Sequence, residues 1–395
     1  MIKRESGRLG RWAMGCLGWR LEQRTEPRNQ TAHRLAAIVV GVVIALIAVQ
    51  LAIGDEDAFN RIYRGTIGSK RGWSNILDLA APLVLTGLAA AVALKLRRWN
   101  VGVEGQFFMG AFAGVAIAFQ LESMSGAPLL ALMFAGAALC GAAWIAVPAI
   151  ARAYLNVNEI LTTLMLNFVA ILFLAYIATG PWRNPQSQGS ILATRDIPEQ
   201  ARLPGVEVAA VEFSSGLLLG IAVAMVLWLV FRSTTFGYMV RTVGGSEQAG
   251  SYAGINVRLL SVAVLLLSGG VAGVAGVAHM TGGDTNAYAT SLSNNTGYLG
   301  IAVAVLAGGS FPVVVFMAGV IGAIISAGSA LRLLDVGSEL GSFGLTGFIL
   351  LMAAIGEGLA NYRLRRERPE RETLPPGDQA SPAAAAGGAG GSRGT

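Results

Sequence analysis

Carboxylate and amide side chains stand inside stretches of sequence that are otherwise apolar, and their types and spacing could do chemistry. One group is the segment NVGVEGQ, which contains Asn100, Glu104 and Gln106. Its two closely spaced glycines favour a break in a helix, whose freed backbone groups can line a cavity with the acid and the amides. The alternative is a cytoplasmic turn that ends one helix at a glycine and starts the next with Glu104 near its N-terminus.

A second group follows helical spacing. Glu159, Thr163 and Asn167 are four residues apart, so a helix would place them in one polar stripe, while its other faces are apolar. A polar stripe on a helix in lipid must face inward. It could line a pathway, or it could supply interhelical hydrogen bonds that only hold a bundle together.

A third group lies at 284–300 and includes Asn295 and Tyr298. The pattern Asn-x-Gly-x-x-Gly that starts at Asn100 occurs again from Asn295. Each copy follows an apolar segment, and the two segments are expected to cross the membrane in opposite directions. Matching breaks in opposite orientations indicate an inverted repeat. Interrupted segments at corresponding places in two halves point to a transport pathway.

The segment 241–258 predicts a short amphipathic helix that is capped by Ser246 and closed by Gly254. Its small residues and Tyr252 would offer a docking surface to a partner. Alone this signal is weak, because many surface helices look similar.

The sequence contains no pattern that predicts a catalytic site or a metal site. The chain has two Cys and two His, which are far apart in the sequence, and it lacks the phosphate-binding pattern G-x-x-x-x-G-K-[ST]. We therefore expect no catalytic residue, no metal and no bound cofactor, which argues against a membrane-embedded enzyme. An ion-gradient-driven transporter or channel would need more ionisable residues inside the spans than this chain offers. Its candidates are Asp78, Glu104, Glu159 and Glu357.

The elements that must position these groups are membrane-spanning helices. Hydrophobic residues make up 54% of the chain and charged residues only 13%, against about a quarter in soluble domains. Crossing a bilayer takes about 20 apolar residues in a helix. The sequence predicts an all-α polytopic protein with ten such segments, of which the eighth is too short to cross alone: 35–53, 76–96, 103–121, 126–150, 159–180, 213–232, 258–280, 298–309, 313–334 and 342–361.

Basic residues set the expected orientation, because Lys and Arg near span ends stay on the cytoplasmic side. With both chain ends inside, 21 of the 29 Lys and Arg residues fall in cytoplasmic segments. The pI of about 9.6 therefore reflects the inner face and does not indicate nucleic acid. We expect a basic cytoplasmic tail at 1–34, a transmembrane domain at 35–362 and a disordered cytoplasmic tail at 363–395.

Several strings together carry a resemblance over roughly 35–360: NVGVEGQ, NEILTTLMLN, RTVGGSEQAGSYAGINV with LLSGGVAGVAG, and GYLGIAVAVLAGG. The chain resembles the permease subunits of ABC importers in the branched-chain amino acid and simple sugar superfamily, in the branch associated with nucleoside uptake. The resemblance implies about ten helices in inverted halves, dimerised around a central path. It also implies a cytoplasmic loop that docks on an ATPase, with Ser246 replacing the usual Asn. This coupling loop would contain Arg241, Gly244, Gly245, Ser246, Glu247, Ala249, Gly254, Ile255 and Asn256.

The resemblance further implies partners and a location. A separate cytoplasmic ATP-binding subunit would use the ATP, and a periplasmic or lipid-anchored substrate-binding protein would deliver the solute. A second permease, identical or paralogous, would complete a path that works by alternating access. The chain would then be a multi-pass protein of a bacterial inner membrane that carries nucleosides or related polar solutes such as sugars.

Overall fold

The structure is a computed structural model that describes residues 58–124, 126–184, 194–282 and 293–332, the short pieces 19–23 and 362–366, and the single residues 40 and 347. The chain divides into two compact units. One contains both chain ends, at 1–28 and 358–395, and the other contains 29–357.

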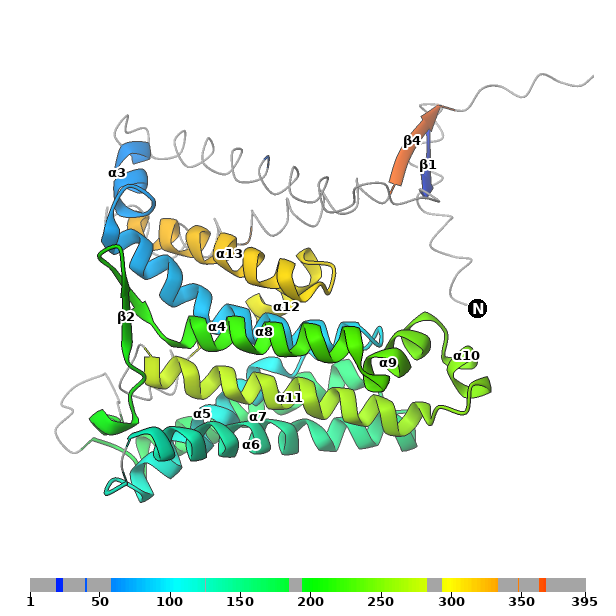
Figure 1. Cartoon of the computed structure of the whole chain (residues 1–395), viewed down its shortest axis with the longest axis horizontal. Helices are drawn as coiled ribbons and strands as arrows, with labels where there is room; N and C mark the ends of the chain where they lie inside the picture. Colours follow the sequence, from blue (N-terminus) through cyan, green and yellow to red (C-terminus); the bar gives the residue numbers. More distant parts are fainter. Residues whose placement is uncertain are drawn as a thin grey trace, which may run out of the picture. The chain divides into compact units, whose positions relative to one another are not determined.

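The larger unit is a bundle of helices (Figure 1). Six described helices are long and apolar enough to cross a membrane, namely α4, α6, α7, α8, α11 and α13. The helices are α3 (Ala58–Gly65), α4 (Lys70–Leu94), α5 (Val103–Gln120), α6 (Gly126–Leu155), α7 (Glu159–Thr179), α8 (Gly216–Ser233), α9 (Thr235–Gly245), α10 (Glu247–Tyr252), α11 (Val257–Gly282), α12 (Thr296–Leu306) and α13 (Phe311–Arg332).

Eight of the ten expected spans coincide with described helices, within a few residues at most ends. The short eighth segment is α12, which has 11 residues. The expected spans at 35–53 and 342–361 lie outside the described residues, except for single helical residues at 40 and 347. The chain is thus mostly helical and has several potential membrane spans, while the full number of ten stays a prediction.

Small residues place α4 and α11 at the centre of the bundle. Every residue from 80 to 93 of α4 is buried, and Ala and Gly are interspersed there among larger apolar residues. At Gly273 of α11, a Cβ atom would lie 2.1 Å from the carbonyl oxygen of Ala137 in α6. Without side chains at such positions, helix backbones approach closely, which is how apolar helices pack in membranes.

The chain is mostly helical, as expected, but it also contains short strands. In the larger unit, β2 (Gly205–Val208) and β3 (Val211–Ser214) form an antiparallel hairpin. Its two turn residues, Ala209 and Ala210, both have positive φ, as a two-residue turn with the right-handed twist of the strands requires. The hairpin takes the start of the expected span 213–232, so α8 begins only at Gly216.

The smaller unit contains a second antiparallel pair, β1 (Trp19–Gln23) with β4 (Tyr362–Arg366). Apolar residues alternate with polar ones in both strands, and Leu21 lies opposite Leu364. The expectation of a disordered tail from residue 363 stays a prediction; its first residues, 363–366, belong to β4.

The two ends of the helical bundle differ. Figure 1 shows α9 and α10 at one end and the β2–β3 hairpin at the other. We call these the α10 end and the hairpin end. Because α4 begins near the hairpin and α11 begins just after α10, these two central helices run in opposite directions.

Candidate functional site: a buried polar network and a charged cluster

The turn between α4 and α5 lies deep in the bundle. Asn100 is only 3% exposed, and its Nδ2 donates hydrogen bonds to Gln106 Oε1 at 2.9 Å and to Ser268 Oγ at 2.8 Å. Ser268 stands in the middle of α11, and its hydroxyl donates to the carbonyl oxygen of Ala89 in α4. Asn100 is thus level with the middle of α11, which favours the helix break over the surface turn.

Asn167 of α7 caps the N-terminus of α5. Gly102 is the N-cap of α5 and has no side chain for the task, so the N–H of Gly105 donates to Asn167 Oδ1 at 2.9 Å. Nδ2 of Asn167 donates to the carbonyl oxygen of Val101 at 2.9 Å and to the Tyr298 hydroxyl at 3.1 Å. The fully buried amide therefore connects α7, α5 and α12.

Thr163 lies one turn before Asn167 and is also buried, and its hydroxyl donates to the backbone carbonyl of Glu159. The stripe predicted on this helix does face the inside of the bundle. Its first member differs, because the Glu159 carboxylate makes ion pairs with Arg98 and Arg152.

Glu104 of α5 performs a matching role at α12. The N-cap residue Asn295 makes no side-chain hydrogen bond to α12. Instead the N–H of Gly297 donates to Glu104 Oε2 at 2.7 Å, and the hydroxyl of Ser293 donates to Oε1. A carboxylate at a helix N-terminus is stabilised by the unpaired N–H groups and the helix dipole.

The two copies of the Asn-x-Gly-x-x-Gly pattern therefore meet. A Cβ atom on Gly297 would lie 2.6 Å from both the Cα and the backbone N of Glu104, so only glycine lets the two helix starts approach this closely. We call the polar side chains here the break network, and all of them are buried except the half-buried Tyr298: Asn100, Glu104, Gln106, Thr163, Asn167, Ser268, Ser293 and Tyr298. Asn295 stands apart from it, exposed and with a φ of +64°.

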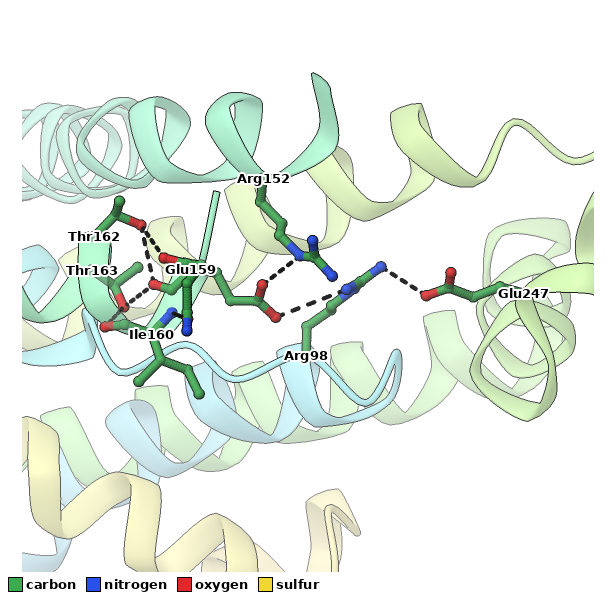
Figure 2. Close-up of polar contacts among 8 residues, drawn as sticks. Arg98, Arg152, Glu159, Ile160, Thr162, Thr163 and Glu247 are labelled. Carbon is green, nitrogen blue, oxygen red and sulfur yellow. Dashed lines mark hydrogen bonds and ion pairs between the residues drawn. The ribbon is translucent and has the colours of Figure 1, made fainter. Parts of the chain in front are cut away.

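A charged cluster lies between α10 and the break network (Figure 2). The Arg98 side chain points between two acids, and its guanidinium is 2.7 Å from Glu247 Oε1 and 3.9 Å from Glu159 Oε1. Arg152 pairs with the other oxygen of Glu159. Arg98 belongs to the turn after α4 and Glu247 to α10. Glu159 is the first residue of α7, and Arg152 belongs to the last turn of α6.

The segment expected to dock a partner folds as two short helices, α9 and α10. Ser246 caps α10, as predicted, by accepting a hydrogen bond from the N–H of Ala249. Beyond its last residue, the N–H of Gly254 donates to Ser251 O and that of Ile255 to Gly250 O, both at 3.0 Å. This is a Schellman motif, which requires the positive φ of 76° found at Gly254.

The other residues of this segment hold it against the bundle. Arg241 donates to the carbonyl oxygen of Phe231 in α8, and Asn256 caps α11 through the N–H of Leu259. A Cβ atom on Gly244 would lie 2.2 Å from the carbonyl oxygen of Lys95, so α9 presses directly on the turn after α4. Gly245 is exposed and has open space around it.

Sequence reasoning missed three residues of these two sites, Arg98, Arg152 and Ser268, and it included Ser293 only as part of the polar group at 284–300. Single serines and span-end arginines are common in membrane helices and show no special spacing. Among the described residues, no group of three or more His, Cys, Asp or Glu side chains could hold a metal ion.

Comparison with known proteins identifies the family of the chain. The family described as "Branched-chain amino acid transport system / permease component" matches residues 72–354. The glucose ABC transporter permease protein of Haloferax volcanii is 34% identical, over 75% of this chain and 78% of its own length.

Two further relatives are named for nucleosides. The guanosine ABC transporter permease protein of Bacillus subtilis is 31% identical over 73% of this chain and 83% of its own length. The nucleoside ABC transporter permease protein of Lactococcus lactis is 27% identical over 75% of this chain and 82% of its own length. With most of its length matched, the chain belongs to the family of permease components of branched-chain amino acid type transport systems.

Proposed function

We propose that the chain is the membrane subunit of an ATP-driven importer for uncharged, hydroxyl-bearing solutes, namely nucleosides or sugars. Family membership supports the transport role, and the names of the relatives support the solute class. One observation supports the mechanism most strongly. The N-termini of two broken helices, α5 and α12, contact each other in a buried polar network. Transporters place their solute sites at such breaks.

The solute path follows the break network. Polar side chains inside a membrane protein are costly and persist where they face protein or water. The N-termini of α5 and α12 converge here, so their partly positive ends favour electron-rich groups such as hydroxyl oxygens. The residues proposed to line the path are Asn100, Glu104, Gln106, Thr163, Asn167, Asn295 and Tyr298, with Glu159 at its α10 end.

In this proposal, the ATP-binding subunit drives transport by pushing on α10. A helix closed at both ends by caps is a rigid element, and its Tyr252 side chain is 92% exposed and ready to contact a partner. A push on α10 would act on Arg98 through Glu247, then on Glu159 at the start of α7. Two turns further along α7, Asn167 caps α5. The same helices thus connect the docking surface to the break network.

The proposed partners follow from the exposed surfaces. The docking segment would bind a separate ATP-binding subunit, so ATP would be used outside this chain. The outward faces of α6, α7 and α8 carry exposed large apolar residues, such as Leu139, Leu172 and Met225, which suit lipid and a second permease. A substrate-binding protein would deliver solute at the hairpin end.

The orientation proposed here puts the α10 end and both termini in the cytoplasm of a bacterium, with the chain in its inner membrane. The Lys and Arg distribution supports this arrangement.

An ion-gradient-driven transporter is the second candidate. One observation favours it: Glu104 is a carboxylate only 2% exposed at the centre of the bundle, the kind of residue that can relay protons. However, Ser293 and Gly297 already donate hydrogen bonds to both carboxylate oxygens, which gives Glu104 a structural role.

ATPase measurements separate the two candidates. The chain is reconstituted with its ATP-binding subunit, and hydrolysis is measured with and without solute-loaded binding protein. We expect the loaded binding protein to stimulate hydrolysis severalfold, and only when this chain is present. An ATP-binding subunit that neither co-purifies with the chain nor responds to it would contradict the proposal.

A further inference from the structure

A cavity of about 300 Å³ lies at the hairpin end, and none of its lining residues is among those assigned to the path or to coupling. It is bounded by the first turns of α4, by β3 and by the last turns of α11 and α13. More than half of its described lining residues have polar side chains, including Asn75, Asp78, Ser214, His279, Ser326 and Ser329. Its volume matches the lower end of small-molecule sites, which begin at about 300 Å³.

Two polar groups in this cavity have hydrogen-bonding capacity left over. Asp78 Oδ1 accepts a hydrogen bond from the backbone N–H of Ser214 at 2.8 Å, while Oδ2 has no partner among the described residues. Ser326 is only 4% exposed and lies on the wall of the cavity contributed by α13. The Asp78 carboxylate is exposed and both residues line the cavity, so their polar atoms are available to a ligand there.

The charges of the lining residues determine which class of ligand the cavity can bind. None of the described lining residues is Lys or Arg, and the one carboxylate is that of Asp78. A phosphate or carboxylate would therefore meet repulsion without compensation. A hydroxyl group would donate a charge-assisted hydrogen bond to Asp78 and could pair with Ser326.

The cavity also adjoins the break network. Asn294, which lines the cavity, precedes the α12 cap and follows Ser293, the residue that donates to Glu104. The His279 ring lies 5.7 Å from the ring of Phe107, on the turn of α5 after Glu104. A solute in the cavity would be next to the starts of both broken helices.

We infer that this cavity is a solute-binding site of the permease, in which Asp78 accepts hydrogen bonds from the hydroxyl groups of an uncharged sugar or of the ribose of a nucleoside. The inference rests on the proposed function and adds to it a binding site and a basis for selecting neutral solutes over phosphorylated ones. Glucose and guanosine, which occur in the names of relatives, share this hydroxyl chemistry.

The first test is protection of a cysteine. Ser329→Cys is introduced after replacement of Cys16 and Cys140 by Ser, and the full chain is placed in nanodiscs, where both faces are accessible. We expect glucose or guanosine to slow maleimide labelling at this position at least threefold, and guanosine monophosphate to have no effect. Ser251→Cys, at the α10 end, should label at the same rate throughout.

The second test is uptake by the complete transporter carrying Asp78→Asn. The amide keeps the shape and the bond to Ser214 but loses the charge, so we expect KM to rise about tenfold or more. Glu212→Gln removes a neighbouring exposed carboxylate that does not line the cavity, and it should leave KM unchanged.

The inference fails if the transporter imports glucose or guanosine but neither slows labelling, or if the monophosphate protects equally well. It also fails if Asp78→Asn leaves KM unchanged. Protection without any ATP-driven uptake would instead reject the proposed function and keep the binding site.

Discussion

Glu104 and Asn167 each do for another helix what an N-cap residue normally does for its own. Asn167 accepts from the third N–H of α5, and Glu104 accepts from the second N–H of α12. Caps supplied from a neighbouring helix connect the position of one helix start to that of the next. A small shift of α7 would therefore break the hydrogen bond at α5.

Replacement of Asn167 by Leu tests this capping role. The variant loses hydrogen bonds to Gly105, Val101 and Tyr298, each worth roughly 0.6–2 kcal/mol in a membrane protein. We expect a lower thermal unfolding midpoint and at least fivefold slower uptake by protein that is still inserted. Thr179→Val, at the exposed end of the same helix, should change neither. Wild-type uptake by Asn167→Leu would remove this residue from the site.

Gly297→Ala tests the contact between the two breaks. The added methyl group would lie 2.6 Å from the backbone of Glu104, so α12 must move away from α5. Overpacking of this kind costs about 1–3 kcal/mol, and we expect uptake to fall severalfold.

Gly319→Ala in α13 is the matched control for this substitution. A Cβ atom there would meet nothing within 4 Å, so stability should change by less than about 0.5 kcal/mol. If both alanine variants behaved alike, the close approach of the two helix starts would not matter for transport.

Residue types explain what could be predicted at this scale. Amides and acids inside apolar segments are rare enough to be noticed, and this identified Asn100, Glu104 and Asn167. Ser268 was not identified, because serine is common in membrane helices. The sequence also could not show that Glu159 faces Arg98 while Thr163 faces the network, because a helical stripe fixes a shared face but not a shared partner.

At the scale of elements, α10 is a short helix whose position depends on contacts at both of its ends. Glu247 in its first turn pairs with Arg98, and the Schellman motif at Gly254 fixes the direction of the chain into α11. Ser and Gly at the correct spacing predicted both ends of this helix. Its ionic contact with the turn after α4 involves residues 149 positions apart, which no local pattern can reveal.

A double-mutant cycle on Arg98 and Glu247 measures whether this contact transmits the push. Each residue is changed to Gln alone and together, and stimulation of the ATPase is measured. We expect each single change to reduce stimulation and the double change to reduce it no further, with a coupling of about 0.5–1 kcal/mol.

Glu122→Gln is the control, because it breaks an ion pair, with Arg195, that involves neither α10 nor the turn after α4. It should leave ATPase stimulation unchanged. Strictly additive effects at Arg98 and Glu247 would mean that their ion pair carries no coupling.

The helix boundaries were largely predictable, since apolar length and capping residues are local properties. The β2–β3 hairpin was not, because an apolar run such as Val-Glu-Phe before a helix is indistinguishable from the first turn of a span. Its Ala-Ala turn also lacks the Asn-Gly or Gly-Gly signal of tight hairpins.

At the scale of the whole molecule, burial separates a centre from a periphery. α4 and α11 are largely enclosed by other helices, whereas α6, α7 and α8 expose most of their apolar residues. A soluble protein would not present such faces to water, so they lie against lipid or another subunit. The repeat of the Asn-x-Gly-x-x-Gly pattern was visible in the sequence, but its contact in space needed the structure.

Orientation is tested by single cysteines in a chain whose native Cys residues are replaced by Ser. Glu207→Cys in the hairpin should react with an impermeant maleimide added outside intact cells. Ser251→Cys in α10 should react only after the membrane is opened. Both positions are exposed in the structure. Labelling of Ser251→Cys alone from outside would invert the orientation.

The central claim is that this chain conducts solute in response to ATP hydrolysis by a partner. Uptake of labelled guanosine and glucose into proteoliposomes tests it most directly, with the chain assembled with its ATP-binding subunit and binding protein. We predict uptake that requires ATP and both partners and is unaffected when ion gradients are dissipated. Uptake by the chain alone, driven by a proton or sodium gradient without ATP, would contradict the account.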